Sequence, residues 1–494
     1  MRFVPFPSAA KRPSADLCCL PFACDSSGGV VPLFDDTRLQ QAVGRLLDTT
    51  DFRAKVGESI VLYPESKTES RLMVIGLGEL SGITTDTIRQ AYAKSLSSLR
   101  KRSLTSVTCM TPRVEPVAPQ LVYRGILEGL LLGSYSFQEY RSEKEAMAIE
   151  EVGVLAEDPS AFLEVEREVI ARMSALSLCR DLVNQNADEM NPQGFAEVAS
   201  TLSRDGLMVT PHGKEWIERQ GMRLLLAVGK GAQYEPRFII AEWQGAPQSH
   251  EKTVLVGKGI TFDTGGLDLK PFENMKGMKG DMAGAAAVLA VMQAVRDLKL
   301  PINVTALMPL CENSIGSRSY KPDDVYRARS GKSIEIGSTD AEGRLILADA
   351  LDYGVKDLGA TRIIDVASLT GAAAVALGPD ISAFFSNTDS LAYDLEQASV
   401  RAGEPLWKMP LHMGYVDLLD SDIADCKNVG GRAGGAITAA LFLHFFVGQT
   451  PWAHFDLGGT SLLKEPRLCF GKGATGVLVR TLVDYFLQLS KTNL

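Results

Sequence analysis

Two short stretches of the chain combine carboxylates with basic side chains at close spacing. The first stretch holds Lys258, Asp263, Lys270 and Asp281, and the second holds Asp340, Glu342 and Arg344. Four carboxylates that met in a fold would repel one another, and two divalent cations would balance their charge. Two such cations ~3.5–4 Å apart repel by roughly 17–19 kcal/mol at an effective dielectric of about 20, so carboxylates must bridge them. The residue types therefore indicate a site for two divalent metal ions.

Basic residues in the same stretches have two distinct uses at a metal site. Lys258 can bind a metal if the ion holds its amine neutral against an ordinary pKa of about 10.4. Lys270 and Arg344 remain as fixed positive charges for negative charge that develops during a reaction. The five histidines form no H-x-x-H or H-E-x-x-H pair, so we expect a metal site that is not built on histidine.

Each stretch also has a purely structural interpretation. Thr339 and Glu342 have the spacing of a helix capping box, and Asp340 would favour a helix N-terminus. Asp281 could begin the apolar helix that follows it, and Asp263 could belong to a plain turn. Both stretches, however, follow expected strand ends and precede expected helices, where open α/β sheets place ligand sites. Their joint placement favours the functional interpretation.

The elements that would position these residues alternate between strands and helices. Helices are expected at about 85–100 and 121–132, and apolar runs bounded by turn residues predict the strands. These predicted strands are Leu72–Gly76, Ser106–Met110, Val152–Leu155, Leu224–Val228, Phe238–Trp243, Thr253–Gly257, Ile302–Met308 and Arg362–Ala367. The alternation predicts an α/β fold with largely parallel pairing.

Domain organisation follows from the same patterning. Residues 1–160 are expected to form a smaller N-terminal α/β domain. Apolar residues at three- and four-residue steps predict a long connecting helix within residues 161–189. Residues 190–494 would then form a larger C-terminal α/β domain, in which a central mixed sheet is flanked by helices.

Composition excludes several classes of protein. The 494 residues are 45% hydrophobic and 22% charged, which argues against a disordered or membrane-spanning chain. A net charge of −9 argues against nucleic acid as the main partner. The eight cysteines include no C-x-x-C pair and indicate a reducing cytoplasm, with a mitochondrial location as the less favoured alternative.

One glycine-rich segment supports an alternative, non-catalytic function. Residues Gly76 to Gly82 read G-x-G-x-x-x-G between an expected strand and an expected helix. This pattern is a weak signal for a nucleotide-binding turn, and a plain tight turn explains it more simply. A nucleotide-binding role is thus one alternative to a catalytic metal site, and a non-catalytic or secondary nucleic-acid-binding role is a second.

The acidic motifs resemble one known family. The segments 258–266, 281–286 and 339–345, the last reading T-D-A-E-G-R-L, are similar to the signatures of the leucyl (cytosol) aminopeptidases, peptidase family M17. The resemblance extends through residues 190–494 and includes 367–372. Over residues 1–160 only the general α/β pattern of the family's macro-like N-terminal domain is met. This chain departs from the usual pattern of the family at Ser338, Lys279 and Ala283, none of which is an expected ligand.

The resemblance implies a role for each residue of the site. Lys258 and Asp281 would bind the tighter metal, Asp340 the more exchangeable one, and Asp263 and Glu342 would bridge both. Lys270 would polarise the scissile carbonyl, and Arg344 would hold a bicarbonate ion that acts as a base. Leu369 and Gly371 would offer backbone hydrogen bonds to the substrate, and Met278 would line the pocket for its first side chain.

The family also implies the reaction and its participants. The expected enzyme is a metallo-aminopeptidase that removes an N-terminal, preferably leucine-like, residue from peptides with a free α-amino group. Two ions of Zn²⁺ or Mn²⁺ per subunit are expected, with Mg²⁺ or Co²⁺ as alternatives. A cytoplasmic homohexamer with no membrane association is the expected assembly.

Overall fold

The computed structural model describes residues 1–47, 51–64, 70–99, 103–144 and 148–492. The chain divides into two compact units, and the boundary between them falls inside the long helix α4 (Pro159–Asn184). The first unit comprises Met1–Met173 and Glu465–Gly471, and the second comprises Ser174–Lys464 and Lys472–Leu494. Each unit has its own sheet, which confirms the expected two-domain α/β fold.

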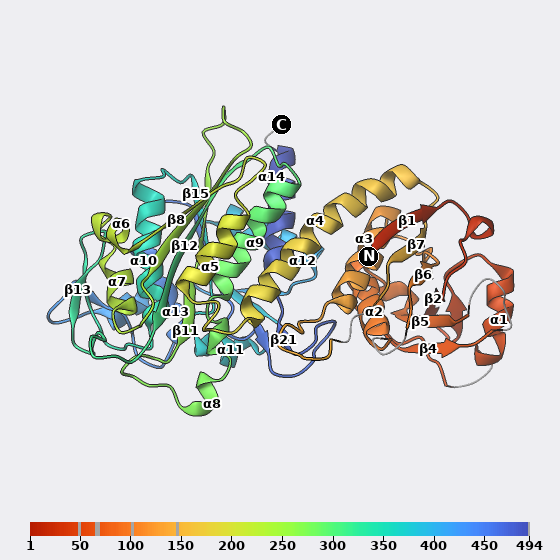
Figure 1. The fold of residues 1–494 in the computed structure, drawn as a ribbon, viewed down its shortest axis with the longest axis horizontal. Coiled ribbons are helices and arrows are strands. Elements are labelled where there is room, and N and C mark those ends of the chain that lie inside the picture. Colours follow the sequence, from red (N-terminus) through yellow and green to blue (C-terminus); the bar gives the residue numbers. More distant parts are fainter. Residues whose placement is uncertain (48–50, 65–69, 100–102, 145–147, 493–494) are drawn as a thin grey trace. The chain divides into compact units, whose positions relative to one another are not determined.

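The first unit contains a largely parallel sheet. Its described strands follow the order β1-β7-β6-β2-β5-β4, with β3 beside β2 (Figure 1). The strands are β1 (Arg2–Phe6), β2 (Leu17–Cys24), β3 (Val30–Pro32), β4 (Ser59–Leu62), β5 (Leu72–Glu79), β6 (Ser106–Cys109) and β7 (Glu151–Leu155). Among the strands described in this unit, only β3 and β4 pair antiparallel with their neighbours. The predicted strands in this region are confirmed.

Helices of the first unit join these strands. They are α1 (Thr37–Leu47), α2 (Thr85–Ser97) and α3 (Pro119–Ser134), with single turns η1 (Ala9–Lys11) and η2 (Leu80–Gly82). Both predicted helices are confirmed, although residue 100, the expected end of the first, lies outside the described residues. Thr84 caps α2 by accepting a hydrogen bond from the N–H of Thr87, as an N-cap threonine does.

The glycine-rich segment considered for nucleotide binding lies mainly inside strand β5. A Cβ at Gly76 would lie 2.3 Å from the carbonyl oxygen of Lys55. The N–H of Gly78, where φ is +91°, donates to the carbonyl of Ala54. A neighbouring backbone thus occupies the space that these glycines leave. This close approach explains the glycines without a bound phosphate.

The second unit is built on a mixed sheet of nine described strands. Their order is β17-β16-β19-β15-β10-β12-β9-β8, with β11 beside β12. The strands are β8 (Met208–His212), β9 (Arg237–Gln244), β10 (Thr253–Gly257), β11 (Gly259–Asp263), β12 (Asn303–Asn313), β15 (Arg362–Ala367), β16 (Ser382–Ser386), β17 (Leu406–Lys408) and β19 (Trp452–Asp456). The small strands are β13 (Val325–Arg327), β14 (Ser333–Glu335), β18 (Cys426–Lys427), β20 (Leu462–Leu463) and β21 (Gly473–Ala474).

Helices cover both faces of this sheet (Figure 1). On one face lie α5 (Pro192–Thr201), α9 (Ala283–Asp297), α12 (Asp389–Ala402) and α14 (Val479–Thr492). On the other lie α7 (Arg223–Gly229), α10 (Glu342–Lys356) and α13 (Gly435–His444). The remaining helical segments are α6 (Lys214–Arg219), α8 (Phe272–Met275), α11 (Gly371–Leu377), η3 (Met278–Gly280) and η4 (Met413–Leu419). None of the helices in the described part of the chain is long and apolar enough to span a membrane.

The four central strands place their carboxyl ends at one edge of the sheet. Strands β12, β10, β15 and β19 are mutually parallel along this path. Open α/β sheets place ligand sites outside such an edge. The loops that leave these strands contain most of the residues singled out from the sequence.

One predicted strand is wrong, because residues 224–228 form helix α7 instead. The apolar run Leu224–Val228 is short, and such a run fits a buried strand and a buried helix equally well. Asp349 of α10 decides between them. Its Oδ2 accepts hydrogen bonds from the N–H groups of Leu224 and Leu225, at 2.9 and 3.2 Å, at the start of the helix. A carboxylate 125 residues away in sequence thus caps the helix.

This cap predicts that Asp349→Ala lowers the free energy of unfolding of the second unit. The change leaves the buried N–H groups of Leu224 and Leu225, and the partly buried N–H of Arg329, without their acceptor. The cost is about 1–3 kcal/mol for an unsatisfied buried group. All four tryptophans lie in this unit, so their fluorescence during urea unfolding reports on it alone. Asp394→Ala, at an exposed position on α12, is the control. Equal midpoints for the two variants would contradict the assignment.

Candidate active site

Lys258 follows strand β10 at the edge of the sheet. Its N–H donates to the carbonyl of Val366 on β15, and its carbonyl accepts from the N–H of Ala285 on α9. Gly284 allows this close packing, because a Cβ there would lie 2.0 Å from the carbonyl oxygen of Val366. The backbone of Lys258 is therefore clamped between a strand and a helix.

The side chain of Lys258 is buried among acidic groups. Its Nζ lies 2.7 Å from Asp281 Oδ2 and 2.9 Å from Glu342 Oε1. The same nitrogen donates to the carbonyl of Ser368 at 2.9 Å. Burial favours the neutral amine, but Asp281 and Glu342 outweigh it and raise the pKa of Lys258. Without a metal, this lysine is an ammonium ion.

Gly343 provides the space for that side chain. A Cβ at Gly343 would lie 2.5 Å from Cε and 2.8 Å from Nζ of Lys258. Any larger residue at the first turn of α10 would therefore push the amine away from its acidic partners. Gly343 in the second motif is therefore needed for the side chain of Lys258, in the first motif, to fit.

Asp281 does not cap the helix that follows it. Helix α9 begins at Ala283, and its N-cap residue is Met282, whose side chain forms no capping hydrogen bond. The Asp281 carboxylate instead accepts a 2.7 Å hydrogen bond from Ser368 Oγ and pairs with Lys258. Burial raises the pKa of Asp281 to about 8 despite this pairing.

Asp263 ends strand β11 and is held from three sides. Its Oδ1 accepts hydrogen bonds from the N–H of Gly265 at 2.9 Å and from Nδ2 of Asn313 at 2.8 Å. Its Oδ2 lies 2.8 Å from Lys270 Nζ. Burial is the main reason that the pKa of Asp263 is raised, to about 6. The turn expected here exists, and it serves to orient the carboxylate.

The second motif does not form a capping box. Helix α10 begins at Glu342, and its N-cap residue is Ala341, whose side chain forms no capping hydrogen bond. Thr339 Oγ1 instead donates to the carbonyl of Gly265 at 2.7 Å and accepts from the N–H of Asp268 at 2.8 Å. The threonine thus joins the loop of the second motif to the loop of the first.

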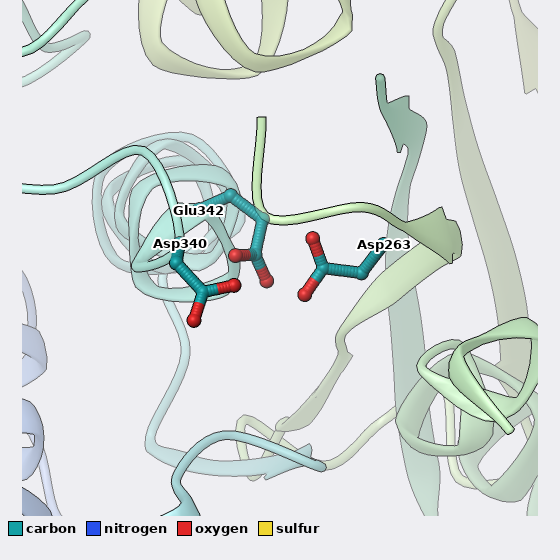
Figure 2. Close-up of side chains that lie close together, drawn as sticks. All are labelled: Asp263, Asp340 and Glu342. Atoms are coloured by element: carbon teal, nitrogen blue, oxygen red, sulfur yellow. The ribbon is translucent and has the colours of Figure 1, made fainter. Parts of the chain in front are cut away.

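Three carboxylates converge where the two loops meet. Asp263, Asp340 and Glu342 each offer an oxygen within 4.8 Å of the others, and Figure 2 shows their carboxyl groups turned toward one another. Glu342 is buried, whereas the side chain of Asp340 is 39% exposed. Lys270 Nζ forms ion pairs with both Asp263 and Asp340.

The donor set fits divalent metal ions. Glu342 Oε2 is buried and has no hydrogen-bond partner among the described residues. Four carboxylates face only two lysines here, so negative charge exceeds positive charge even when both lysines are protonated. Carboxylate oxygens suit Mg²⁺ and Mn²⁺, and an amine nitrogen favours Zn²⁺.

Arg344 lies in the first turn of α10 and is buried, and it forms no ion pair with a carboxylate among the described residues. Its Nη1 donates to the carbonyl of Asn428 at 2.6 Å, and its Nε has no hydrogen-bond partner in the part of the chain that is described. Burial lowers the pKa of Arg344 to about 10, against the opposing effects of Glu342 and Asp456. A guanidinium in this setting fits a small anion.

The three residues expected to contact substrate lie in the neighbouring loops. Met278 is half-buried in η3, Leu369 follows β15, and Gly371 begins α11. The N–H of Leu369 donates to Asp456 Oδ1 at 3.0 Å, so only its carbonyl could serve a substrate. A Cβ at Gly371 would meet nothing within 4 Å, so this helix start faces open space.

Sequence reasoning missed the residues that hold the charged groups in place. Asn313 contacts Asp263, Ser368 contacts both Lys258 and Asp281, and Asp456 accepts the N–H groups of Leu369 and Thr370. Their shared signal is that each ends or directly follows a strand of the central sheet. That signal becomes visible only once the strand ends are known.

Two family profiles match this chain. The catalytic domain of the cytosol aminopeptidase family matches residues 177–483, and the N-terminal domain of that family matches residues 27–144. All residues of the acidic and basic cluster lie within the first match. Together the two matches cover most of both units.

Individual proteins show similarity over nearly the whole length. A probable cytosol aminopeptidase of Chlamydia trachomatis serovar D is 42% identical over 483 residues, 96% of each chain. A probable cytosol aminopeptidase of Protochlamydia amoebophila is 39% identical over 487 residues, 97% of each chain. The solved structure of the bottromycin maturation enzyme BotP matches with a TM-score of 0.86 and 32% identity over 97% of this chain and 100% of that chain. The structure of BotP in complex with Mn matches with the same TM-score and 33% identity.

The raised pKa values predict that metal binding releases protons. Asp263, Asp281 and Lys258 all hold protons more strongly than usual in the metal-free protein, whereas metal ligands must be deprotonated. The affinity for Mn²⁺ should therefore rise between pH 6 and pH 9, by about tenfold per pH unit for each proton released. Calorimetric titration in two buffers of different ionisation enthalpy measures the number of protons. A pH-independent affinity would show that these groups are not ligands.

Proposed function

This chain belongs to the cytosol aminopeptidase family, peptidase family M17, whose members are metallopeptidases, and we propose that it removes N-terminal residues from peptides at a two-metal site. The observation that carries this proposal is the convergence of Asp263, Asp340 and Glu342 within 4.8 Å of one another, beside the Lys258–Asp281 pair. The cluster lies at the carboxyl edge of parallel strands, where α/β enzymes place their ligands.

We propose that the five ligands divide between two ions. Lys258 and Asp281 would bind the tighter ion, because both side chains are buried and held by Ser368. Asp340 would bind the exchangeable ion, since it is the exposed member of the cluster. Asp263 and Glu342 would bridge the two ions, because two cations at short separation repel each other unless shared carboxylates lie between them.

The metal ions and the basic side chains of the site would stabilise the negative charge that develops during hydrolysis. Metals bound here would polarise the peptide carbonyl and lower the pKa of a shared water. Lys270 is only partly buried, and its Nζ lies between Asp263 and Asp340. It would donate to the carbonyl oxygen as that oxygen becomes negative. Arg344 would hold a bicarbonate ion, which would supply a general base beside the metal site.

The identity of the ions is proposed on the donor set. Four carboxylates with one amine suit Mn²⁺ or Zn²⁺, and Mg²⁺ or Co²⁺ are alternatives. BotP, the structural relative, is described in complex with Mn, which supports manganese for this chain.

The proposed substrates are peptides with a free α-amino group and a leucine-like first residue. Met278, half-buried in η3, would provide apolar surface for that residue. The carbonyl of Leu369 would accept a hydrogen bond from a substrate N–H, and Gly371 would donate its own N–H from the start of α11. The relatives named cytosol aminopeptidase support a cytoplasmic location, and the homohexamer stays a prediction.

We predict that Lys270→Ala lowers kcat without loss of metal. The lysine competes with a cation for Asp263 and Asp340, so its removal should not weaken metal binding. Loss of one group that stabilises an oxyanion lowers kcat by about 10²–10³-fold. Lys276→Ala, an exposed lysine in the same loop, is the control. Elemental analysis after gel filtration should find two ions per chain in both variants, and fewer in Asp340→Ala. Loss of metal from Lys270→Ala would make this lysine part of the metal site.

We predict that an N-acetyl group on the substrate abolishes cleavage. A neutral α-amine can bind the metal beside Asp340, whereas an ammonium is repelled and an amide has no available lone pair. Because an α-amino group has a pKa of about 7.7–8.0, kcat/KM should rise through this range. Leucinamide and N-acetyl-leucinamide are compared from pH 6 to pH 9. Cleavage of the capped substrate, or internal cuts in a long peptide, would identify an endopeptidase.

A further inference from the structure

Asn428 is a fully buried asparagine that directly follows strand β18. Strand β18 pairs in parallel with β14, where Cys426 lies beside Ile334 and Lys427 beside Glu335. The N–H of Asn428 continues this ladder by donating to the carbonyl of Glu335. The register of the small sheet thus places Asn428 beside the chain that leaves β14 toward α10.

The side chain of Asn428 binds the backbone of the loop that carries Asp340. Its Oδ1 accepts hydrogen bonds from the N–H groups of Gly337 and Ser338, at 2.8 and 3.2 Å. Its Nδ2 donates to the carbonyls of Ser338 and Ala341, at 2.7 and 3.4 Å. One amide therefore spans the loop on both sides of Asp340.

The backbone of Asn428 reaches the other functional group of this region. Its carbonyl accepts the 2.6 Å hydrogen bond from Arg344 Nη1. The loop between β14 and α10 belongs to no sheet, so its backbone groups need partners from elsewhere. Asn428 supplies partners for the loop and for the guanidinium from one buried position.

We propose that Asn428 is a positioning residue for the exchangeable metal, which holds Asp340 in ligating position through the loop from Gly337 to Ala341. This inference rests on the proposed function, because it takes Asp340 as a metal ligand. Asn428 does not itself touch the reacting atoms. Partners that orient a ligand typically change metal affinity by 10–100-fold when they are removed.

The effect should be confined to one of the two ions. The tighter ion is assigned to Lys258 and Asp281, which are held by Ser368 and receive no hydrogen bond from Asn428. A general loss of folded structure would weaken the binding of both ions. Selective loss at the weaker site is therefore the signature of positioning.

Asn303 provides a matched control at the opposite edge of the sheet. Its Oδ1 accepts from the N–H of Ala246, and its Nδ2 donates to the carbonyls of Ala246, Ser249 and Glu251, at 2.7, 3.1 and 3.3 Å. It begins β12, whose other end is Asn313, about 33 Å away at a rise of about 3.3 Å per residue. Asn303→Ala removes a comparable set of loop contacts far from the acidic cluster.

The experiment compares Asn428→Asp, Asn428→Ala and Asn303→Ala with the unaltered full chain. Asn428→Asp keeps the size and both accepted hydrogen bonds, and it replaces the donated pair by a carboxylate oxygen that faces the carbonyls of Ser338 and Ala341. It covers the case in which Asn428→Ala does not fold. Thermal unfolding without metal, followed by tryptophan fluorescence, measures stability. Calorimetric titration with Mn²⁺ alone measures the two dissociation constants, and hydrolysis of leucinamide is measured as a function of Mn²⁺ concentration.

We expect both Asn428 variants to bind Mn²⁺ at the weaker site about 10–100-fold less tightly, which is the range known for partners of metal ligands. The affinity of the tighter site should stay nearly unchanged. Hydrolysis should recover as Mn²⁺ is raised, in step with occupancy of the weaker site. Asn303→Ala should keep both constants. Unchanged Mn²⁺ affinities in a folded Asn428→Asp, or equal weakening at both sites, would overturn the inference. If the unaltered chain binds fewer than two Mn²⁺ ions or does not hydrolyse leucinamide, the proposed function itself fails.

Discussion

Buried negative charge is the constraint on which this structure depends. Asp263, Asp281 and Glu342 are almost fully buried, and Asp340 lies beside them. Isolated carboxylates in such surroundings would take up protons or destabilise the fold. Lys258 and Lys270 compensate part of the charge in the metal-free protein. Burial, reinforced by the negative charge of Glu342, keeps the pKa values of Asp263 and Asp281 raised, so a cation that binds here would replace protons.

The architecture concentrates that charge by bringing loops together at one edge of a sheet. Parallel strands β10, β15 and β19 end side by side, so Lys258, Ser368 and Asp456 meet although they are far apart in sequence. Close packing makes the arrangement rigid. Gly284 admits the clamp on the Lys258 backbone, and Gly343 leaves room for its side chain. Small residues in these motifs are therefore as necessary as the charged ones.

Much of this organisation could be read from the sequence by pattern alone. Apolar runs predicted β5 and β10, because strands buried on both faces need apolar side chains throughout. Clustered carboxylates indicated metal chemistry, because four carboxylates that meet need cations to balance their charge. Predictions from local patterns were wrong where the same short pattern fits two different structures. The run at residues 224–228 became α7, and the spacing of Thr339 and Glu342 did not produce a capping box.

Residue types and their order along the chain therefore determined the α/β class, the acidic motifs and the family to which the chain belongs. Only the tertiary structure decided which neutral groups hold those motifs in place. Asn313, Ser368 and Asn428 contact partners that are 50, 87 and 90 residues away. A hydrogen bond depends on distance and direction in space, and no local pattern encodes either for residues so far apart. Asparagine and serine are also common in ordinary turns, so their function becomes visible only when the strands that carry them are aligned.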